Sequence, residues 1–518
     1  MTAPRVLMLG WEFPPFITGG LGTACHGLTR GLTRAGCDIT FALPRSINRS
    51  HASHVRLLSP SSEVAERFAW VAPPSGTITE STQQVVSSEV ERAVQRSTSR
   101  EESLRRGTPE RIKILDFLAV AQSAYASGPA QDRVLTTTRE LLGMTASQLS
   151  AMSDLEFERV IKSIPGASIP GSPQELAVWR ALPEAGHGSS HDAAATTLQI
   201  GGYDGDLILA AERYAHFCVR AAQNLPFDII HAHDWLTYPA GIALARLTGR
   251  PLVVHVHATE FDRSGEHVNQ AVYNIERRGM HAAVRVLAVS MLTRNLLINR
   301  YGLPANKIDV IYNGVDLEPS TFGIKRIERT ERIVLYFGRI TMQKGPEYFV
   351  RAAKRVLEVE KNVRFVVAGS GDQATAMIEM AAEMGIGNRM TFTGFLRGKD
   401  IQRVFALADL YVMPSVSEPF GIAPLEAMGH RVPVIISKNS GVSEVLTHAL
   451  KVNFWDVDDM ANKIVAVLRH PPLRAELRDR GLFEVRGITW DGAAKHCLES
   501  YKQAIAAVGG SFGSASRN

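Results

Sequence analysis

The chain has 518 residues, of which 45% are hydrophobic and 21% are charged, and its formal net charge is +5. This length exceeds what one hydrophobic core fills, so two or three globular domains are expected. The mild positive charge favours a solvated basic surface over an anionic substrate or a preference for a charged surface, and no nucleic-acid partner is expected. The four cysteines form no Cys-x-x-Cys pair, which argues against a disulfide framework or a cysteine zinc site.

The first residues lead directly into a strand pattern without the apolar core of a signal peptide. No apolar run approaches the roughly 18 residues that a membrane-spanning helix needs. We therefore predict a cytoplasmic protein without a transmembrane segment, while a peripheral membrane contact and the oligomeric state stay open.

Apolar runs alternate with helical patterns along the first half of the chain, after a first strand at residues 5–10. Further strands are predicted at residues 38–43, 227–232, 251–256 and 284–288, and helices at 21–35 and 270–282. This alternation is typical of a parallel sheet covered by helices. Residues 46–200 interrupt it, because they are rich in Ser, Ala, Thr, Arg and Glu. We interpret them as a large, mostly helical and partly mobile insertion in the first domain, either a spacer or a part in substrate recognition.

The second half repeats the same alternation. Strands are predicted at residues 332–337, 364–368, 390–393, 410–413 and 432–436. A short strand from residue 308 ends in an Asn-Gly turn, and the polar stretch that follows it is the predicted hinge. The fold class is therefore α/β, with two doubly wound, Rossmann-like parallel-sheet domains facing across a cleft. We place them at residues 1–316 and 317–490, with a disordered tail at 508–518.

Two groups of polar residues lie in the first domain where strands end. Gly19 and Gly20 lie between the first strand and the first helix, where glycines leave room for a substrate and expose backbone N–H groups. The pairs His231/His233 and His255/His257 each share one face of a strand, because strand side chains alternate. Ligands bind at the carboxyl ends of such strands, so a polar substrate-binding wall is the favoured interpretation. A structural role and a metal site are the alternatives, and no further ligands at suitable spacing support the metal.

The second domain carries cations and glycines at the ends of its strands. Arg339 and Lys344 follow an apolar strand and lie five positions apart in a loop. Two cations there neutralise a diphosphate and the charge that develops as it leaves, unless both are simply solvated loop charges. Gly371 and Phe395 follow the next two strands and are expected to frame a nucleotide base.

Glu418 and Glu426 are eight positions apart, in a segment that follows a buried strand. We expect a helix to begin at Phe420–Gly421, which puts Glu418 in the turn and Glu426 about a turn and a half into the helix. Gly421 lets the backbone approach an anion at the helix N-terminus. Because carboxylates repel an anion, they are expected to bind neutral hydroxyls attached to it, as in a sugar carried on a phosphate.

Four motifs then carry a family resemblance. They are Gly-Gly-Leu-Gly at residues 19–22, His-Ala-His-Asp-Trp at 231–235, Gly-Arg-x-x-x-Gln-Lys-Gly at 338–345 and Glu-Pro-Phe-Gly-x-x-x-Leu-Glu at 418–426. In this order they resemble the retaining GT-B glycosyltransferases, in particular glycosyltransferase family 4 and the glycogen and starch synthases. The resemblance covers roughly residues 1–45 and 205–507, and the insertion lies outside it.

The resemblance implies a nucleotide sugar bound mostly by the second domain, and a last helix at 491–507 that crosses back to the first. It implies that Arg339 and Lys344 bind the diphosphate and that Glu418 contacts the sugar hydroxyls. It also implies that Glu426 holds the ribose and that the backbone of Gly421 and Ile422 reaches the phosphates. His257 matches the histidine near the reacting carbon, and Glu12 and Asp234 match acidic residues on the acceptor side.

The expected activity is transfer of a hexose to a hydroxyl of an α-1,4-glucan, with retention of configuration. Glucose is the favoured hexose, and ADP- or UDP-glucose is the favoured donor. No cofactor and no metal are expected, because no Asp-x-Asp lies in a suitable loop and the two cations replace a metal. Two departures from bacterial glycogen synthases, Thr18 in place of Lys and the presence of Glu426, leave donor and acceptor open. The alternatives are a family 4 enzyme of cell-surface polysaccharide or glycolipid synthesis, a non-catalytic sugar-nucleotide scaffold and, more remotely, a metal hydrolase.

Overall fold

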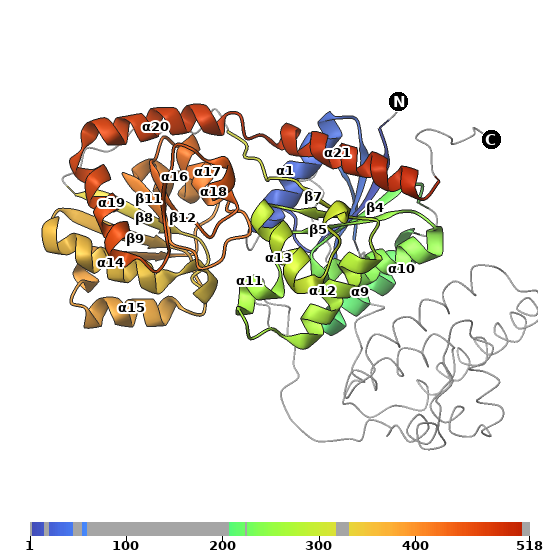
Figure 1. Ribbon diagram of the computed structural model, residues 1–518, viewed down its shortest axis with the longest axis horizontal. Helices are drawn as coiled ribbons and strands as arrows, with labels where there is room; N and C mark the ends of the chain where they lie inside the picture. Colours follow the sequence, from blue (N-terminus) through green and yellow to red (C-terminus); the bar gives the residue numbers. More distant parts are fainter. Residues whose placement is uncertain are drawn as a thin grey trace, which may run out of the picture. The chain divides into compact units, whose positions relative to one another are not determined.

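The computed structural model describes residues 3–14, 20–44, 54–59, 207–222, 225–317 and 331–509 (Figure 1). These residues form two parallel sheets, one of seven strands in the order β3-β2-β1-β4-β5-β6-β7 and one of six in the order β10-β9-β8-β11-β12-β13. The predicted α/β class is confirmed, since each sheet is parallel and its strands are connected through helices.

The first sheet contains the N-terminal strands. Its strands are β1 (Arg5–Leu9), β2 (Asp38–Ala42), β3 (Arg56–Leu58), β4 (Ile229–His233), β5 (Leu252–Val256), β6 (Arg285–Ala288) and β7 (Ile308–Val310). The chain around it forms α1 (Gly20–Arg34), α9 (Leu207–Ala222), η2 (Trp235–Thr237), α10 (Tyr238–Thr248), α11 (Glu260–Ser264), α12 (Gln270–Ala282), α13 (Met291–Tyr301) and η3 (Ala305–Lys307). All residues of β4 and β5 are buried, which explains why both read as nearly continuous apolar runs broken only by histidines.

The second sheet follows the same plan. Its strands are β8 (Arg332–Phe337), β9 (Val363–Ala368), β10 (Met390–Gly394), β11 (Leu410–Met413), β12 (Val434–Ser437) and β13 (Leu450–Val452). The chain around it forms η5 (Met342–Lys344), α14 (Pro346–Val359), α15 (Ala374–Glu383), η6 (Gly387–Arg389), α16 (Lys399–Leu407), α17 (Ala423–Gly429), α18 (Val442–Val445), α19 (Val457–Arg469) and α20 (Pro471–Val485). Alternate residues of β8 enter different cores, Val334 and Tyr336 on one face and Leu335 on the other.

The last helix, α21 (Trp490–Ala507), packs against α1 although the two are far apart in the sequence (Figure 1). Trp490, Ala494 and Tyr501 of α21 share one buried cluster with Cys25 and Leu28 of α1. Among the described residues, no helix combines the length and the hydrophobicity that crossing a membrane requires.

Some expected features differ from the structure or fall outside it. The helix expected from Phe420–Gly421 begins at Ala423 instead, because Gly421 adopts a φ of 101°, which no helix permits. The edge strand β3 lies inside the range assigned to the insertion and pairs with β2. Apart from residues 54–59, the predicted insertion at 46–200 lies outside the described residues, and so do residues 510–518 of the predicted tail.

Candidate active site

Four histidines stand side by side where β4 and β5 end. The rings of His231 and His233 are 4.3 Å apart between centroids, and those of His255 and His257 are also 4.3 Å apart. This confirms that each pair shares one face of its strand. The two pairs also meet each other, because Nδ1 of His233 is hydrogen-bonded to Nε2 of His257 at 2.9 Å.

Burial keeps these rings uncharged. Only His257 is partly exposed, and the rings of His231, His233 and His255 are buried. Desolvation lowers the pKa of all four histidines, and that of His257 to about 3. The prediction of a polar substrate-binding wall is therefore wrong for the three buried histidines. His257 presents a neutral imidazole at neutral pH.

Asp234 holds the chain that follows β5. Its Oδ1 accepts hydrogen bonds from the backbone N–H of His257 at 2.7 Å and of Ala258 at 3.4 Å. Its own backbone has a φ of 57° and a ψ of 169°, a conformation that costs about 1–3 kcal/mol for a residue other than glycine. Burial raises the pKa of the Asp234 carboxyl to about 7. Such strain persists where the surrounding structure requires it, and here it aims a carboxylate at the His257 backbone.

The other expected residues of the first domain lie near this group or beyond the described residues. Glu12 is buried in the loop after β1, and its carboxylate acts electrostatically on Cys25, as does that of Asp234. Gly20 opens α1, and none of the described atoms lies within 4 Å of where its side chain would begin. Gly19 lies outside the described residues.

The loop after β8 carries the two expected cations. Arg339 is exposed, and among the described residues its guanidinium has no hydrogen-bond or ion-pair partner. Lys344, at the end of η5, forms an ion pair with the carboxylate of Glu418. Gly345 follows with a φ of 62°, and a side chain there would lie 2.1 Å from the carbonyl oxygen of Pro414. The loop of Lys344 is therefore pressed against the segment that contains Glu418.

Glu418 is fixed in a buried position. Besides Lys344, its carboxylate accepts a hydrogen bond from the hydroxyl of Ser415 at 3.3 Å, and its backbone N–H donates to Asn439 at 3.0 Å. The carbonyl oxygen of Gln343 accepts from the N–H of Val416, which attaches this segment to the loop of Lys344. The structure thus brings together two of the four residues expected to be catalytic.

Glu426 has different surroundings. It lies in the first turn of α17 and not a turn and a half into a helix, because the helix begins late. Its carboxylate is partly buried and has no partner among the described residues, and burial raises its pKa to about 7. Both glutamates act on the phenol of Tyr411, whose pKa burial raises first of all. A carboxylate without a partner in such a place can accept hydrogen bonds from the hydroxyls of a neutral ligand.

The remaining expected residues line other loops at the ends of the strands. Gly421 approaches the Glu418 side chain, since a side chain on it would lie 3.1 Å from Cγ of Glu418, and Ile422 precedes α17. Gly371 is required by packing, because a side chain there would lie 2.2 Å from the carbonyl oxygen of Ile340. Phe395 is 47% exposed, and the guanidinium of Arg397 lies 5.2 Å from its ring centre.

Sequence reasoning missed Asp262, which connects the loops of His257 and Glu418. One of its oxygens accepts from the N–H and the hydroxyl of Thr259, both at 2.8 Å. The other accepts from the hydroxyl of Ser417 at 2.6 Å. The Thr-x-x-Asp pattern at 259–262 was a readable helix-capping signal, but nothing in it pointed to a partner 155 positions away.

Three family models match the chain one after another. The starch synthase catalytic domain matches residues 5–96, glycosyltransferase family 4 matches 204–319, and glycosyl transferases group 1 matches 319–482. Residues 5–96 are thus similar to starch synthases, while residues 204–482 are similar to family 4 and group 1 glycosyltransferases.

Individual proteins agree with these models. A glycosyltransferase of Methanocaldococcus jannaschii is 31% identical over 304 residues, which cover 55% of this chain and 77% of the relative. A D-inositol 3-phosphate glycosyltransferase of Pseudarthrobacter chlorophenolicus is 28% identical over 54% of this chain and 71% of its own length. A glycogen synthase of Mycobacterium tuberculosis is 29% identical over 47% of this chain and 61% of its own length.

Among solved structures, sucrose-phosphate synthase from Thermosynechococcus elongatus superposes with a TM-score of 0.61 at 16% identity, over 97% of this chain and all of that one. This likeness concerns the fold, and the sequence relatives add the family. Together with the two parallel sheets, they show that the chain belongs to the GT-B glycosyltransferases, of the glycogen-synthase-like family 4 type.

Proposed function

We propose that this glycosyltransferase moves glucose from ADP-glucose or UDP-glucose to a hydroxyl group of an α-1,4-glucan, with retention of configuration. The observation that supports the nucleotide-sugar donor is the group at the end of β8. There Lys344 contacts Glu418, and Arg339 is exposed without a partner among the described residues. Two cations beside two carboxylates match a ligand that is anionic at one end and rich in hydroxyls at the other. The similarity of residues 5–96 to starch synthases supports the glucan acceptor.

In this proposal the diphosphate binds Arg339 and Lys344. The bond between the anomeric carbon and the diphosphate oxygen breaks, the electron pair stays on the diphosphate, and both cations stabilise the added charge. The acceptor hydroxyl forms the new bond to the anomeric carbon on the same face, and its proton passes to the departing diphosphate oxygen. Because α17 has only seven residues, we assign the charge to the side chains and not to a helix dipole. No metal takes part.

Glu418 and Glu426 would bind different hydroxyls of the donor. Glu418 is held by Lys344 and Ser415 and would orient the transferred sugar. Glu426 has no partner among the described residues and would accept from the ribose. Neutral His257, whose backbone is held by Asp234, would lie beside the reacting carbon as a hydrogen-bonding group and not as an acid.

A second candidate acceptor is a small phosphorylated cyclitol or a lipid-linked sugar. Glu426 favours it, because bacterial glycogen synthases resembled by the N-terminal half lack this glutamate. The similarity to a D-inositol 3-phosphate glycosyltransferase supports the same alternative. The chemistry at the donor would be unchanged, so only the acceptor distinguishes the two.

A screen of nucleotide sugars measures release of free nucleotide with no acceptor, with glycogen, and with D-inositol 3-phosphate. We expect release from ADP- or UDP-glucose that depends on glycogen, and anomeric analysis of the product by NMR then tests retention. Release that needs the inositol phosphate would favour the second candidate, and no release with any donor or acceptor would favour a non-catalytic scaffold.

The matched variant in this screen is Lys344→Ala, with Lys354→Ala on the exposed side of α14 as its control. Losing one cation that stabilises the leaving group removes about 3–4 kcal/mol, so turnover should fall at least about a hundredfold. A folded Lys344→Ala protein with nearly unchanged turnover would contradict the assignment.

A further inference from the structure

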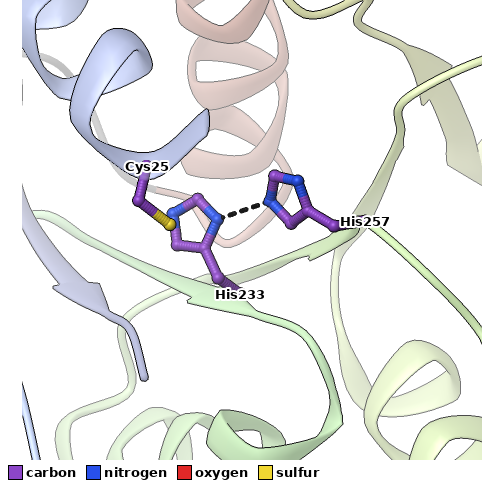
Figure 2. A group of neighbouring side chains, drawn as sticks. All are labelled: Cys25, His233 and His257. Atoms are coloured by element: carbon purple, nitrogen blue, oxygen red, sulfur yellow. Dashed lines mark hydrogen bonds between the residues drawn. The ribbon is translucent and has the colours of Figure 1, made fainter. Parts of the chain in front are cut away.

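The thiol of Cys25 has no part in the proposed transfer, yet it lies against the histidines. Cys25 belongs to α1, His233 is the last residue of β4, and His257 follows β5, so the three side chains come from separate elements (Figure 2). Cys25 and His233 are completely buried, and His257 is partly exposed, which gives solvent a way to reach the group.

The three side chains can each contribute one ligand atom, and these atoms all lie within 4.8 Å of one another. Nitrogen ligands of one tetrahedral zinc ion are roughly 3.3 Å apart, and a nitrogen and a sulfur roughly 3.6 Å apart, given Zn–N and Zn–S bonds of about 2.0–2.1 and 2.3 Å. Nδ1 of His233 and Nε2 of His257 are 2.9 Å apart in a hydrogen bond, which coordination of both nitrogens to one metal ion would replace. Side-chain rotations of roughly an ångström would therefore complete a three-ligand site.

A second histidine triplet lies nearby and is the weaker candidate for a metal site. The atoms of His231, His233 and His255 also lie within 4.8 Å, but these rings are stacked with interplanar angles of 24°, 16° and 28°. The rings of His233 and His257 are inclined by a similar angle of 31°. The second triplet, however, contains no thiol, and Nδ1 of its His231 is already hydrogen-bonded to the hydroxyl of Tyr501 at 2.6 Å. The group that contains Cys25 is the better metal site.

The charges around Cys25 bear on the binding of a cation. Burial first, and then the charges of Asp234 and Glu12, raise the pKa of the Cys25 thiol, so a metal ion must displace the thiol proton when it binds. A cation bound by a thiolate and two neutral imidazoles would carry a net positive charge, which these two carboxylates would compensate.

We propose that Cys25, His233 and His257 bind a soft divalent transition-metal ion such as Zn²⁺, and that its binding switches the transferase off. On binding, the Cys25 thiol gives its proton to solvent and the sulfur forms a bond to the metal, while each histidine binds through an unprotonated nitrogen. Inhibition rests on the proposed function, because the metal would hold His257 away from its place beside the reacting carbon. The ion is an inhibitor here and not a cofactor.

Binding is tested first, without any substrate. Metal-free full-length protein is titrated with Zn²⁺ by calorimetry in buffers of different ionisation enthalpy, and with Co²⁺ by absorption, where a thiolate ligand adds a charge-transfer band. We expect one tight site, release of a proton, and at least a tenfold weaker affinity with loss of that band in Cys25→Ser. Cys37→Ser is the matched control, because Cys37 is equally a buried free cysteine and belongs to neither histidine group.

His257→Gln is the second variant, chosen in case Cys25→Ser does not fold, because His257 is at the partly exposed end of the group. It should weaken Zn²⁺ binding to a similar extent. Equal Zn²⁺ affinity in wild-type, Cys25→Ser and His257→Gln proteins, or no binding at all, would overturn the site.

Inhibition is tested separately by nucleotide release with Zn²⁺ and then with excess chelator. We expect turnover to fall as the site fills and to return with chelator, and Cys25→Ser to resist Zn²⁺ while Cys37→Ser does not. Tight binding without inhibition would overturn the regulatory role. If the protein released nucleotide from no donor, the proposed function would fail, but the Zn²⁺ and Co²⁺ titrations would still decide whether the site exists.

Discussion

At the scale of single residues, Glu418 and Glu426 show how similar side chains receive different tasks. Both lie in one short segment, yet Glu418 is paired with Lys344 and Glu426 has no partner among the described residues. The sequence predicted that both carboxylates lie beside a strand end, because apolar strand and glycine-containing turn are local signals. It could not predict the pairing of Lys344 with Glu418, because they are 74 positions apart and only the tertiary fold brings them together.

Because Glu426 has no partner among the described residues, we expect its carboxylate to destabilise the ligand-free protein in a pH-dependent way. Burial raises its pKa from 4.5 to about 7, so between these values the folded chain holds a proton that the unfolded chain has lost. Stability must therefore fall as pH rises through this window, by at most about 3 kcal/mol and by less where water reaches the carboxylate. Glu426→Gln removes the charge, so it should raise Tm by several degrees at pH 8 and leave it nearly unchanged at pH 4.5.

Thermal unfolding of the ligand-free protein across this pH range measures the effect. Glu379→Gln, on the exposed side of α15, serves as the control and should change Tm by the same small amount at every pH. A difference between wild type and Glu426→Gln that does not vary with pH would show that the carboxylate is not the group responsible. The same Glu426→Gln variant should bind nucleotide sugar more weakly, which would explain why a destabilising residue stands there.

At the scale of elements, long periodic segments were predictable and short or bent ones were not. The strand expected at residues 332–337 is β8, and the helix expected at 270–282 is α12, with the same bounds. The three-residue strands β3 and β13 were missed, whereas the equally short β7 was predicted because an Asn-Gly turn follows it. The start of α17 was placed too early because its position depends on the backbone of Gly421, which composition does not reveal.

The contact between α1 and α21 depends on a glycine that faces a tryptophan. A side chain on Gly27 would lie 2.0–2.4 Å from three atoms of the Trp490 indole, which is itself buried. Gly27→Ala gains up to about 1 kcal/mol of helix propensity, but displacing a rigid, buried ring costs about 1–3 kcal/mol. We therefore expect a net loss of stability, measured by urea unfolding as a lower midpoint.

Gly492→Ala is the control within α21, because the nearest atom would lie at an ordinary distance of 3.6 Å. It should leave the midpoint unchanged or raise it slightly. If Gly27→Ala were as stable as Gly492→Ala, the indole would have room to move, and α21 would be held against α1 less tightly than the structure shows.

At the scale of the whole molecule, several hydrogen bonds among the described residues join the first sheet's domain to the second. The carboxylate of Glu444 accepts from the N–H of Met291 at 2.8 Å and of Leu292 at 2.7 Å, at the start of α13. Asp262 accepts from Ser417, as described above. The two-domain plan was predictable from the repeated alternation of strands and helices, and the family resemblance added the activity. These connecting bonds were not predictable, because each joins residues more than 100 positions apart.

The Ser417–Asp262 bond is the connection that involves the site itself. Asp262 also caps Thr259, two positions after His257, and Ser417 immediately precedes Glu418. Ser417→Ala removes one hydrogen bond to a carboxylate, worth about 1.5–3 kcal/mol. Because that bond connects two loops proposed to hold one substrate, we expect turnover in the nucleotide-release assay to fall roughly tenfold.

Ser443→Ala is the matched control, since its hydroxyl bonds only to carbonyl oxygens of its own loop, at Lys438 and Ser440, and its turnover should stay at the wild-type value. Equal turnover in Ser417→Ala and Ser443→Ala would mean that the two loops keep their positions without this bond, and that other contacts align His257 with Glu418.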